Sequence, residues 1–205
     1  MDAIELLEKD HQKVTELFRR FNGGGGLTGL VKRVTGNVPD RQRRQTADQI
    51  CRELEVHTVI EEEIFYPGVR ALNDDRLNGM LAEAFKEHAT VKQLVATIRN
   101  GIGVDDDLQS KMNELQSNVD HHVREEEHEM FPRVELLMDA PRRDRLARDM
   151  RARKQQVEPR PARRRATAAR TRARTRTRRR TVAAAKKRKR VRTTARARTR
   201  GRRGR

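Results

Sequence analysis

The sequence predicts an all-α protein in which residues 1–138 form a helical bundle and a basic tail follows. Two observations predict the bundle: apolar residues recur at steps of three and four along four segments, and one motif occurs twice. Charge predicts the tail, because residues 151–205 contain 26 lysines and arginines and one acid. They carry a net charge of +25, so the +18 of the whole chain leaves −7 for residues 1–150.

The first helix is expected from about Asp2 to Phe21, because the glycines at 23–26 disfavour further helix. Residues 27–39 then form a long connection, interpreted as a mobile linker, with a lid over the bundle mouth as the alternative. The second helix is expected from about Asp40 to Tyr66, where Pro67-Gly68 ends or kinks it.

The third helix begins near an Asn73-Asp74-Asp75 cap and ends at Asn100-Gly101. The fourth starts at Asp105-Asp106-Asp107, and its apolar row runs to Met130. After Pro132 the sequence predicts one or two short helices that cap the bundle and lead outward.

The repeated motif reads HTVIEEEIFYP from His57 to Pro67 and HVREEEHEMFP from His122 to Pro132. In each copy a glutamate, Glu61 or Glu126, follows the first histidine by four residues. A four-residue step places both side chains on one helix face, about 6 Å apart along the axis. Two copies of this motif indicate two halves of one site.

A shorter repeat precedes each copy: Asp10-His11 lies in the first helix and Glu87-His88 in the third, each followed by a valine three residues after the histidine. A purely structural role is disfavoured, because an unpaired buried carboxylate costs several kcal/mol. Imidazoles and carboxylates together suit iron, manganese or zinc, and paired carboxylates can bridge two metals. The predicted metal ligands are His11, His57, Glu61, His88, His122 and Glu126.

This pattern resembles the hemerythrin-like HHE cation-binding domain over about residues 1–138. The resemblance implies an up-and-down four-helix bundle with a non-haem di-iron centre, bridged by Glu61 and Glu126, and manganese or zinc are the alternative metals. Oxygen-carrying hemerythrins have a fifth histidine and an HxxxxD motif on the last helix, whereas here Glu126 and Glu127 follow His122. Reversible oxygen carriage is therefore not carried over, and oxygen, nitric oxide or peroxide is the expected ligand.

Other polar residues near the motifs are expected outside the ligand set. His121 and His128 lie off the apolar row and are predicted to face solvent or support a ligand. Cys51 is predicted to be a small buried filler, and the aromatic residues near the motifs are interpreted as core packing. A solvated acidic face, with contacts to the ligands as the alternative, is predicted for Glu62, Glu63, Glu125 and Glu127.

The tail is expected at 159–205, after a helical extension or linker at 139–158. It is predicted to be disordered alone, because it has no aromatic and almost no bulky aliphatic residue. Its composition resembles the basic tails of linker-histone-like nucleoid proteins and predicts non-specific binding to DNA, with RNA, polyphosphate, anionic membrane surfaces or the protein's own acidic bundle as alternatives. The clusters expected to contact phosphates are Arg163, Arg164, Arg165, Arg178, Arg179, Arg180, Lys186, Lys187, Arg188, Lys189 and Arg190.

One cysteine excludes an internal disulfide, and no apolar run approaches the ~18 residues that span a bilayer. A cytoplasmic, nucleoid-associated protein without membrane insertion is expected. The leading hypothesis is a di-iron sensor or scavenger of oxygen, nitric oxide or peroxide held on nucleic acid by its tail. A nucleoid protein that protects DNA, with a structural or iron-storing bundle, comes second. A di-iron peroxidase or oxidase comes third, because no substrate pocket, nucleophile arrangement or nucleotide loop is recognisable.

Overall fold

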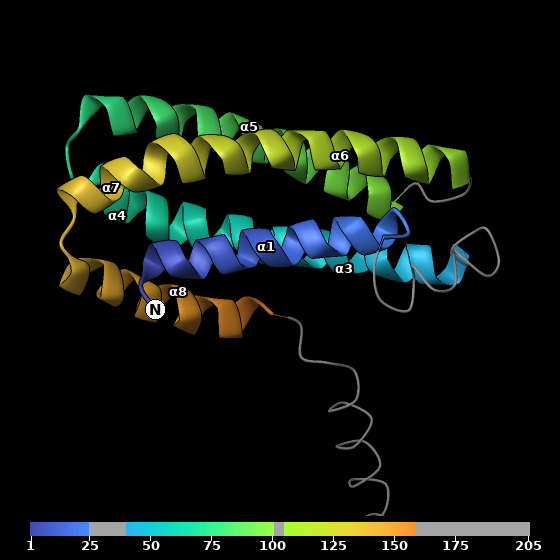
Figure 1. The fold of residues 1–205 in the computed structure, drawn as a ribbon, viewed down its shortest axis with the longest axis horizontal. Coiled ribbons are helices and arrows are strands. Elements are labelled where there is room, and N and C mark those ends of the chain that lie inside the picture. The colour runs from blue at the N-terminus through green and yellow to red at the C-terminus, as the bar shows by residue number, and fades with distance from the viewer. Residues whose placement is uncertain (25–39, 101–104, 159–205) are drawn as a thin grey trace, which may run out of the picture. The chain divides into compact units, whose positions relative to one another are not determined.

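The computed structural model describes residues 1–24, 40–100 and 105–158, and the elements within them are helical (Figure 1). The predicted connection at 27–39 and the predicted tail at 159–205 lie outside the described residues. In chain order the elements are α1 (Ala3–Phe21), α3 (Asp40–Ile60), the π-helical turn η1 (Glu61–Phe65), α4 (Tyr66–Arg70), α5 (Asp75–Asn100), α6 (Asp105–Glu125), the π-helical turn η2 (Glu126–Met130), α7 (Phe131–Leu137) and α8 (Ala140–Val157).

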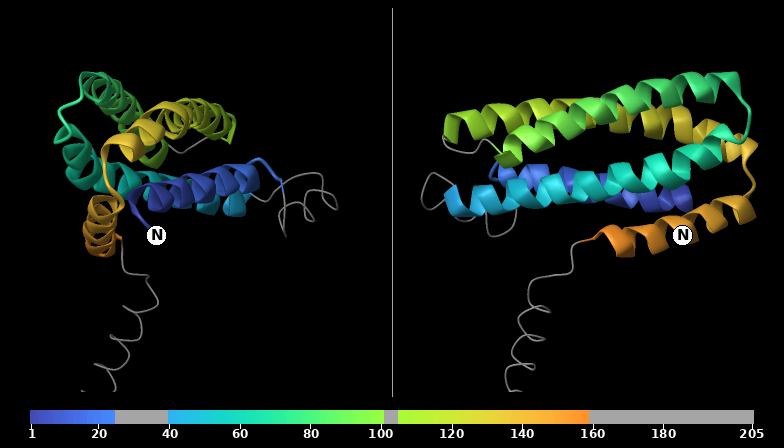
Figure 2. Two further views of the ribbon diagram at one scale, coloured as in Figure 1. Left: turned by 60° about the vertical axis from the view of Figure 1, so that its left-hand side comes forward. Right: turned by 180° about the vertical axis from the view of Figure 1, so that it is seen from behind.

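Four long helices form the predicted bundle. α1 lies beside α3 and α5 lies beside α6, and the two pairs stack on each other with consecutive helices running in opposite directions (Figures 1 and 2). We call α1, α3, η1 and α4 the first half, and α5, α6, η2 and α7 the second half. The expected all-α, up-and-down four-helix bundle is therefore confirmed.

Local sequence sets the helix ends. The Asp2 side chain accepts hydrogen bonds from the N–H groups of Ile4 and Glu5, and the Glu5 carboxylate accepts one from the Asp2 N–H, which together satisfy free donors at the start of α1. Gly23 follows the helix with a φ of 80°, a conformation that glycine adopts without strain. At α5 the predicted cap is confirmed, because Asp74 accepts a hydrogen bond from the N–H of Leu77 at 2.9 Å.

Of the two outcomes expected at Pro67-Gly68, an end or a kink, the end of the second helix is wrong, because helix continues through η1 and α4 to Arg70. In η1 the Tyr66 N–H bonds to the Glu61 carbonyl, five residues back, so the usual hydrogen-bond ladder is interrupted just before the proline. The missing N–H of Pro67 then falls in the first turn of a new helical segment, where proline is tolerated. The second half repeats this arrangement with η2 and Pro132.

α8 is a fifth packed helix. The sequence predicted one or two short helices that cap the bundle and lead outward, and the structure contains, after α7, an 18-residue helix that packs on the bundle with Ala147 and Met150 fully buried in the core. It lies along the first half, against α1, α3 and η1 (Figure 2). Ion pairs support this packing, since Arg143 contacts Asp2 at 2.8 Å. The compact unit therefore runs from Met1 to Glu158.

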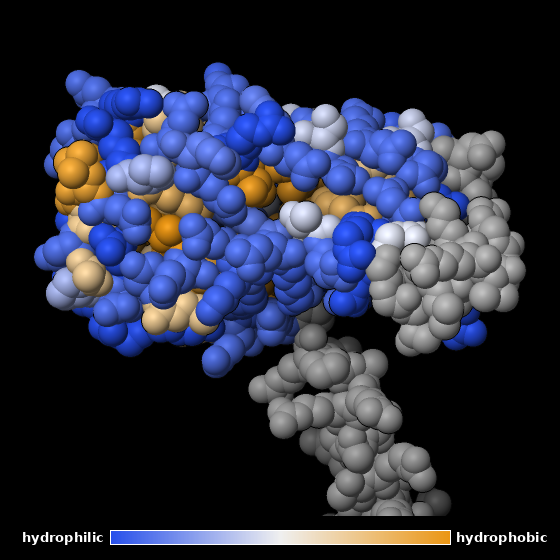
Figure 3. All heavy atoms as spheres, in the orientation of Figure 1, coloured by the Kyte–Doolittle hydropathy of each residue, from blue (hydrophilic) through white to orange (hydrophobic). Residues whose placement is uncertain are grey.

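The core has two apolar clusters, one at each end of the bundle. One contains the start of α1, the two π turns and α8, and the other contains the end of α1 with α3, α5 and α6. Figure 3 shows a mostly hydrophilic surface with hydrophobic atoms visible between helices. None of the described helices is both long and apolar enough to cross a membrane.

Candidate metal centre

Two groups of ligand-type side chains meet inside the bundle. In each group, one potential ligand atom from each residue, a ring nitrogen or a carboxylate oxygen, lies within 4.8 Å of those of the other residues. Glu61 belongs to both groups, so the groups are adjacent and share a carboxylate. The first group contains His11, His57, Glu61 and Glu126, and the second contains Glu61, His88 and His122.

Glu126 also reaches both groups. Its Oε2 lies 3.4 Å from Nε2 of His11 and 3.5 Å from Nε2 of His122. Glu61 Oε2 lies 3.1 Å from Nε2 of His57 and 3.2 Å from Nε2 of His88. Each carboxylate thus lies between imidazoles from both halves, which is an arrangement suited to two bridged cations.

The polar atoms of this centre are buried without enough partners. His11, His57, Glu61 and Glu126 are at most 5% exposed. Among the described residues, the buried side-chain atoms without a hydrogen bond are Nε2 of His11, both ring nitrogens of His57, both carboxylate oxygens of Glu61, and Oε2 of Glu126. Since leaving a buried carboxylate unpaired costs several kcal/mol, these side chains fit metal ions as their missing partners.

Acidic residues within the two motif copies contact the Nδ1 atoms of two histidines. Nδ1 of His11 lies 2.8 Å from Glu127 and Nδ1 of His88 lies 3.0 Å from Glu62. A carboxylate that accepts a hydrogen bond from Nδ1–H leaves Nε2 free to bind a metal and fixes the ring orientation. Glu62 and Glu127 therefore contact predicted ligands, which was the alternative to a solvated acidic face. Each of them contacts a histidine of the other half.

The two halves differ at their remaining histidine. Nδ1 of His122 lies 2.8 Å from Glu87, the acid that precedes His88 in sequence. The equivalent acid in the first half is Asp10, which binds Nζ of Lys154 on α8 at 2.5 and 2.6 Å. Nδ1 of His57 has no hydrogen-bond partner in the described part of the chain. The added helix thus takes the acid that the repeat would provide for His57.

Burial and mutual charge separate the pKa values of the two central carboxyls. Burial and the charge of Glu126 raise the pKa of Glu61 well above its usual range. Burial acts the same way on Glu126, but His122 and His11 outweigh it and lower its pKa. Burial opposes protonation of His11, yet contacts with Glu126 and Glu127 raise its pKa to about 10. Cations at the centre would replace these protons as the source of positive charge.

Tyr66 is a polar contributor that the sequence analysis interpreted as core packing. Its hydroxyl donates a 2.9 Å hydrogen bond to Glu126, and its ring stacks on His88 with centroids 5.5 Å apart. Burial and the charges of Glu126 and Glu61 raise its pKa well above the usual range, so the hydroxyl stays a donor. The equivalent residue in the second motif is Phe131. This difference between two otherwise similar copies was the sequence feature that could have indicated a polar role for Tyr66.

Several predicted residues lie away from the centre. The His121 side chain is 59% exposed, and His128 is exposed with Nδ1 3.0 Å from the Arg124 carbonyl oxygen. Cys51 is fully buried, and burial raises the pKa of its thiol to about 11. The residues predicted to contact nucleic acid all fall within 159–205, outside the described residues.

The fold and the buried clusters define a metal-binding helical bundle. A match to the Hemerythrin HHE cation binding domain covers residues 2–134, so the chain belongs to this family and is a metal-binding, hemerythrin-like protein. It resembles a crystal structure of a hemerythrin HHE cation-binding domain-containing protein from Mycobacterium kansasii. That match has a TM-score of 0.60 and 21% identity, covering 77% of this chain and 88% of the other.

A curated sequence relative is a protein from Nostoc sp. named DNA nickase, which is 24% identical over 160 residues. The alignment covers 78% of this chain but 41% of the relative, so this chain spans about two fifths of that protein's length.

Proposed function

We propose that the six predicted metal ligands hold two iron ions, with Glu61 and Glu126 as the bridging carboxylates. These ligands are His11, His57, Glu61, His88, His122 and Glu126. The observation that carries this proposal is the convergence of unpartnered, buried nitrogen and oxygen atoms on one space. Manganese and zinc prefer overlapping ligand sets, so the donor set supports a transition metal and metal analysis must identify it.

We further propose that the centre binds, senses or scavenges oxygen, nitric oxide or peroxide. The four imidazoles and two carboxylates would hold an iron pair, which would supply one-electron chemistry, and six side chains would leave room for a small ligand. The protein's own contribution is a dry surrounding: the buried Phe131 ring stacks parallel to His11, and Phe65 packs edge-on against Phe131. Tyr66 keeps a proton next to Glu126.

The glutamate pair after His122 supports oxidation over reversible oxygen carriage. Glu126, four residues later, faces the centre, whereas Glu127, five residues later, contacts Nδ1 of His11. The position at which oxygen-carrying hemerythrins have an aspartate is thus used here to orient a histidine.

The test is metal analysis and optical spectroscopy of full-length protein purified without oxygen. We expect two iron ions per chain and new absorption bands when oxygen or nitric oxide is added to the reduced protein. Protein that contains zinc, or iron that responds to neither gas, would favour a structural or storage role.

We propose that residues 159–205 anchor the bundle on DNA without sequence preference. The support is compositional: residues 151–205 carry +25 beside −7 in residues 1–150, and dense positive charge binds phosphates by releasing their counterions. The name of the Nostoc relative refers to DNA, although it describes a longer protein.

Gel-shift titration of full-length protein and of a chain ending at Glu158, at two salt concentrations, tests this anchor. We expect the full chain to bind duplex DNA with an affinity that falls steeply with salt, and the shortened chain to bind far more weakly. Equal binding by both chains would show that the tail is not the anchor. Supercoiled plasmid in the same assay also reports strand cleavage, since nicking converts it to the relaxed form.

A further inference from the structure

The repeat gives the bundle two equivalent faces, one on each half, and the two faces differ in what lies on them. Aligning His88 with His11 and His122 with His57 superposes the α5–α6–η2 face on the α1–α3–η1 face. α8 packs against α1, α3 and η1 and so covers the face of the first half. On the second half, a pocket of about 270 Å³ occupies the equivalent place.

The residue types at equivalent positions of the two halves also differ between the face under α8 and the face with the pocket. In the first half Leu6 and Ile60 are buried in the same apolar cluster as Met150 of α8. Their counterparts in the second half are Glu83 and Glu125, which line the pocket. Two positions that are apolar beneath α8 are thus acidic on the second half, where none of the described helices covers them. An acidic surface of this kind attracts cations.

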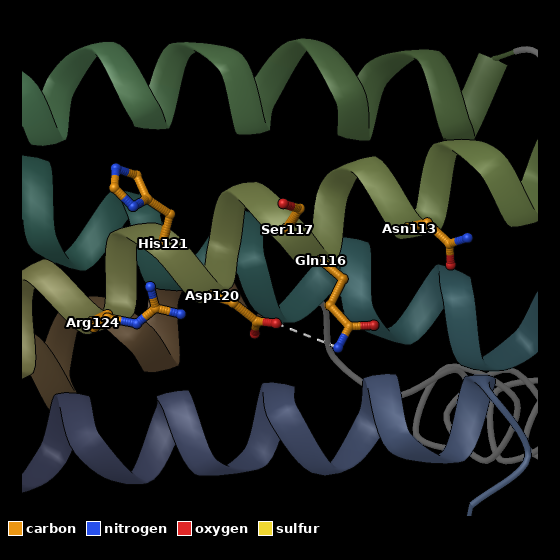
Figure 4. Close-up of a pocket in the computed structure, with 6 residues that line it drawn as sticks. All are labelled: Asn113, Gln116, Ser117, Asp120, His121 and Arg124. Carbon is orange, nitrogen blue, oxygen red and sulfur yellow. Dashed lines mark hydrogen bonds between the residues drawn. The ribbon is translucent and has the colours of Figure 1, made fainter.

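The pocket reaches the metal centre. His122 and Glu126 line it, although they are only 4% and 1% exposed, and Oε2 of Glu126 is one of the buried atoms without a hydrogen bond. A larger hollow of about 550 Å³ on α6, drawn in Figure 4, is lined by Asn113, Ser117 and other polar residues and touches none of the buried ligands. The acidic pocket is therefore the better route inward.

Glu87 and Glu125 line this pocket, and together with His121, which lines the larger hollow of Figure 4, they form a third group with metal-binding spacing. The ligand atoms of Glu87, His121 and Glu125 lie within 4.8 Å of one another. Nε2 of His121 is 3.3 Å from Glu125 and 3.5 Å from Glu87. Figure 4 shows His121 turned towards α5, the helix that carries Glu87. One imidazole and two carboxylates form a donor set that suits divalent iron, manganese or zinc.

Glu87 connects this outer group to the buried centre. One of its oxygens faces His121 and the other lies 2.8 Å from Nδ1 of His122. The Glu87 side chain is 13% exposed, whereas His121 is 59% and Glu125 is 43% exposed. Together, the three residues therefore extend from solvent to Nδ1 of His122, a buried predicted ligand.

We propose that Glu87, His121 and Glu125 bind a divalent transition-metal ion at the mouth of the acidic pocket, and that metal enters the buried centre from there. This inference rests on the proposed metal centre for its second part, while the outer site is a separate claim. The basic partners of the other pocket acids, Lys86 on Glu83 and Arg76 on Glu129, are exposed and pair on the outer surface.

Cobalt(II) titration of metal-free, full-length protein tests the outer site. We expect a third, weaker ion in the wild type, its loss or about tenfold weakening in His121→Ala and Glu125→Gln, and its retention in His128→Ala. His128 is the matched control, because it is an exposed histidine on the adjoining π turn. A wild type without a His121-dependent ion, or equal binding by all four proteins, would overturn the proposal.

Loading kinetics test the route. With limiting iron(II) under anaerobic conditions, we expect the buried centre of His121→Ala to fill several-fold more slowly than that of His128→Ala but to the same final occupancy. Equal loading rates would overturn the entry role. In Glu61→Ala the outer ion should remain and the buried pair should be lost. A wild type that binds only the His121-dependent ion would instead refute the buried centre and keep the outer site.

Discussion

Glu61→Gln should abolish the stabilisation that metal gives without disrupting the metal-free fold. Glu61 is fully buried and belongs to both ligand groups, so this one change removes a ligand from each metal position. Glutamine has nearly the same volume, which preserves packing. In the metal-free protein, burial and Glu126 raise the pKa of Glu61 well above its usual range, so a neutral amide replaces a largely neutral acid. The metal-free proteins should therefore differ by less than about 1.5 kcal/mol.

The effect of metal follows from mass action. A ligand present at about 100 times its dissociation constant stabilises the folded state by about 2.7 kcal/mol for one site. A domain of about this size gains roughly 2–4 °C in melting temperature per kcal/mol. The wild type should therefore melt about 5–10 °C higher with excess iron(II) than without it, and further if both positions fill. Glu61→Gln should gain little, because neither position retains its full ligand set.

Circular dichroism melts of metal-free protein, with and without excess iron(II) under anaerobic conditions, measure both quantities. Glu55→Gln is the matched control, because Glu55 lies on the same helix with its side chain 44% exposed and paired with Arg99. An equal metal-induced shift in Glu61→Gln and the wild type would refute the assignment of Glu61 as a shared ligand. Unfolding of the metal-free variant would refute the argument about its charge.

Three further outcomes are expected. Met150→Ala should lower the free energy of unfolding by about 2–5 kcal/mol in urea titrations, because Met150 is fully buried; a loss below about 0.5 kcal/mol would contradict the packing of α8. Tyr66→Phe should keep the fold but weaken metal binding about tenfold, since Glu126 loses its hydroxyl donor; unchanged affinity in competition with a chelator would contradict this role. Asp74→Asn should destabilise the protein at neutral pH, because Arg133 lowers the pKa of Asp74 from 3.8 to about 2 in the folded state. That advantage is present above about pH 4 and lost as pH falls through 2, so wild-type and variant melts should converge in acid.

The asymmetry around the histidines shows how an added element changes a duplicated site. The repeat places Asp10 before His11 and Glu87 before His88. Glu87 contacts Nδ1 of His122, but Asp10, its equivalent, binds Lys154 of α8 at 2.5 Å and is not available to His57. His57 therefore has no partner for Nδ1 among the described residues, and burial followed by the charge of His11 lowers its pKa well below the usual range. The two groups of ligand-type side chains are therefore chemically different although their sequence motifs are similar.

The sequence by itself determined the helices and the inward-facing row. A His-x-x-x-Glu step places His57 and Glu61 on one face of any α-helix, and the apolar residues around them show that this face points inward. The duplication then indicated that four such helices share one centre. These are local properties of the chain, since periodicity and spacing do not depend on what packs opposite.

Only the tertiary structure decided which residues meet across the bundle. Glu62 and Glu127 have the sequence features of a solvated acidic face, and each contacts a histidine in the other half. Tyr66 reaches Glu126 because η1 inserts one extra residue in the turn, which single-residue propensities do not reveal. The charged segment at 140–157 packs as α8 because the first half offers an apolar surface to Ala147 and Met150. Such contacts depend on the relative placement of distant segments, and helical periodicity specifies a buried face without specifying its partner.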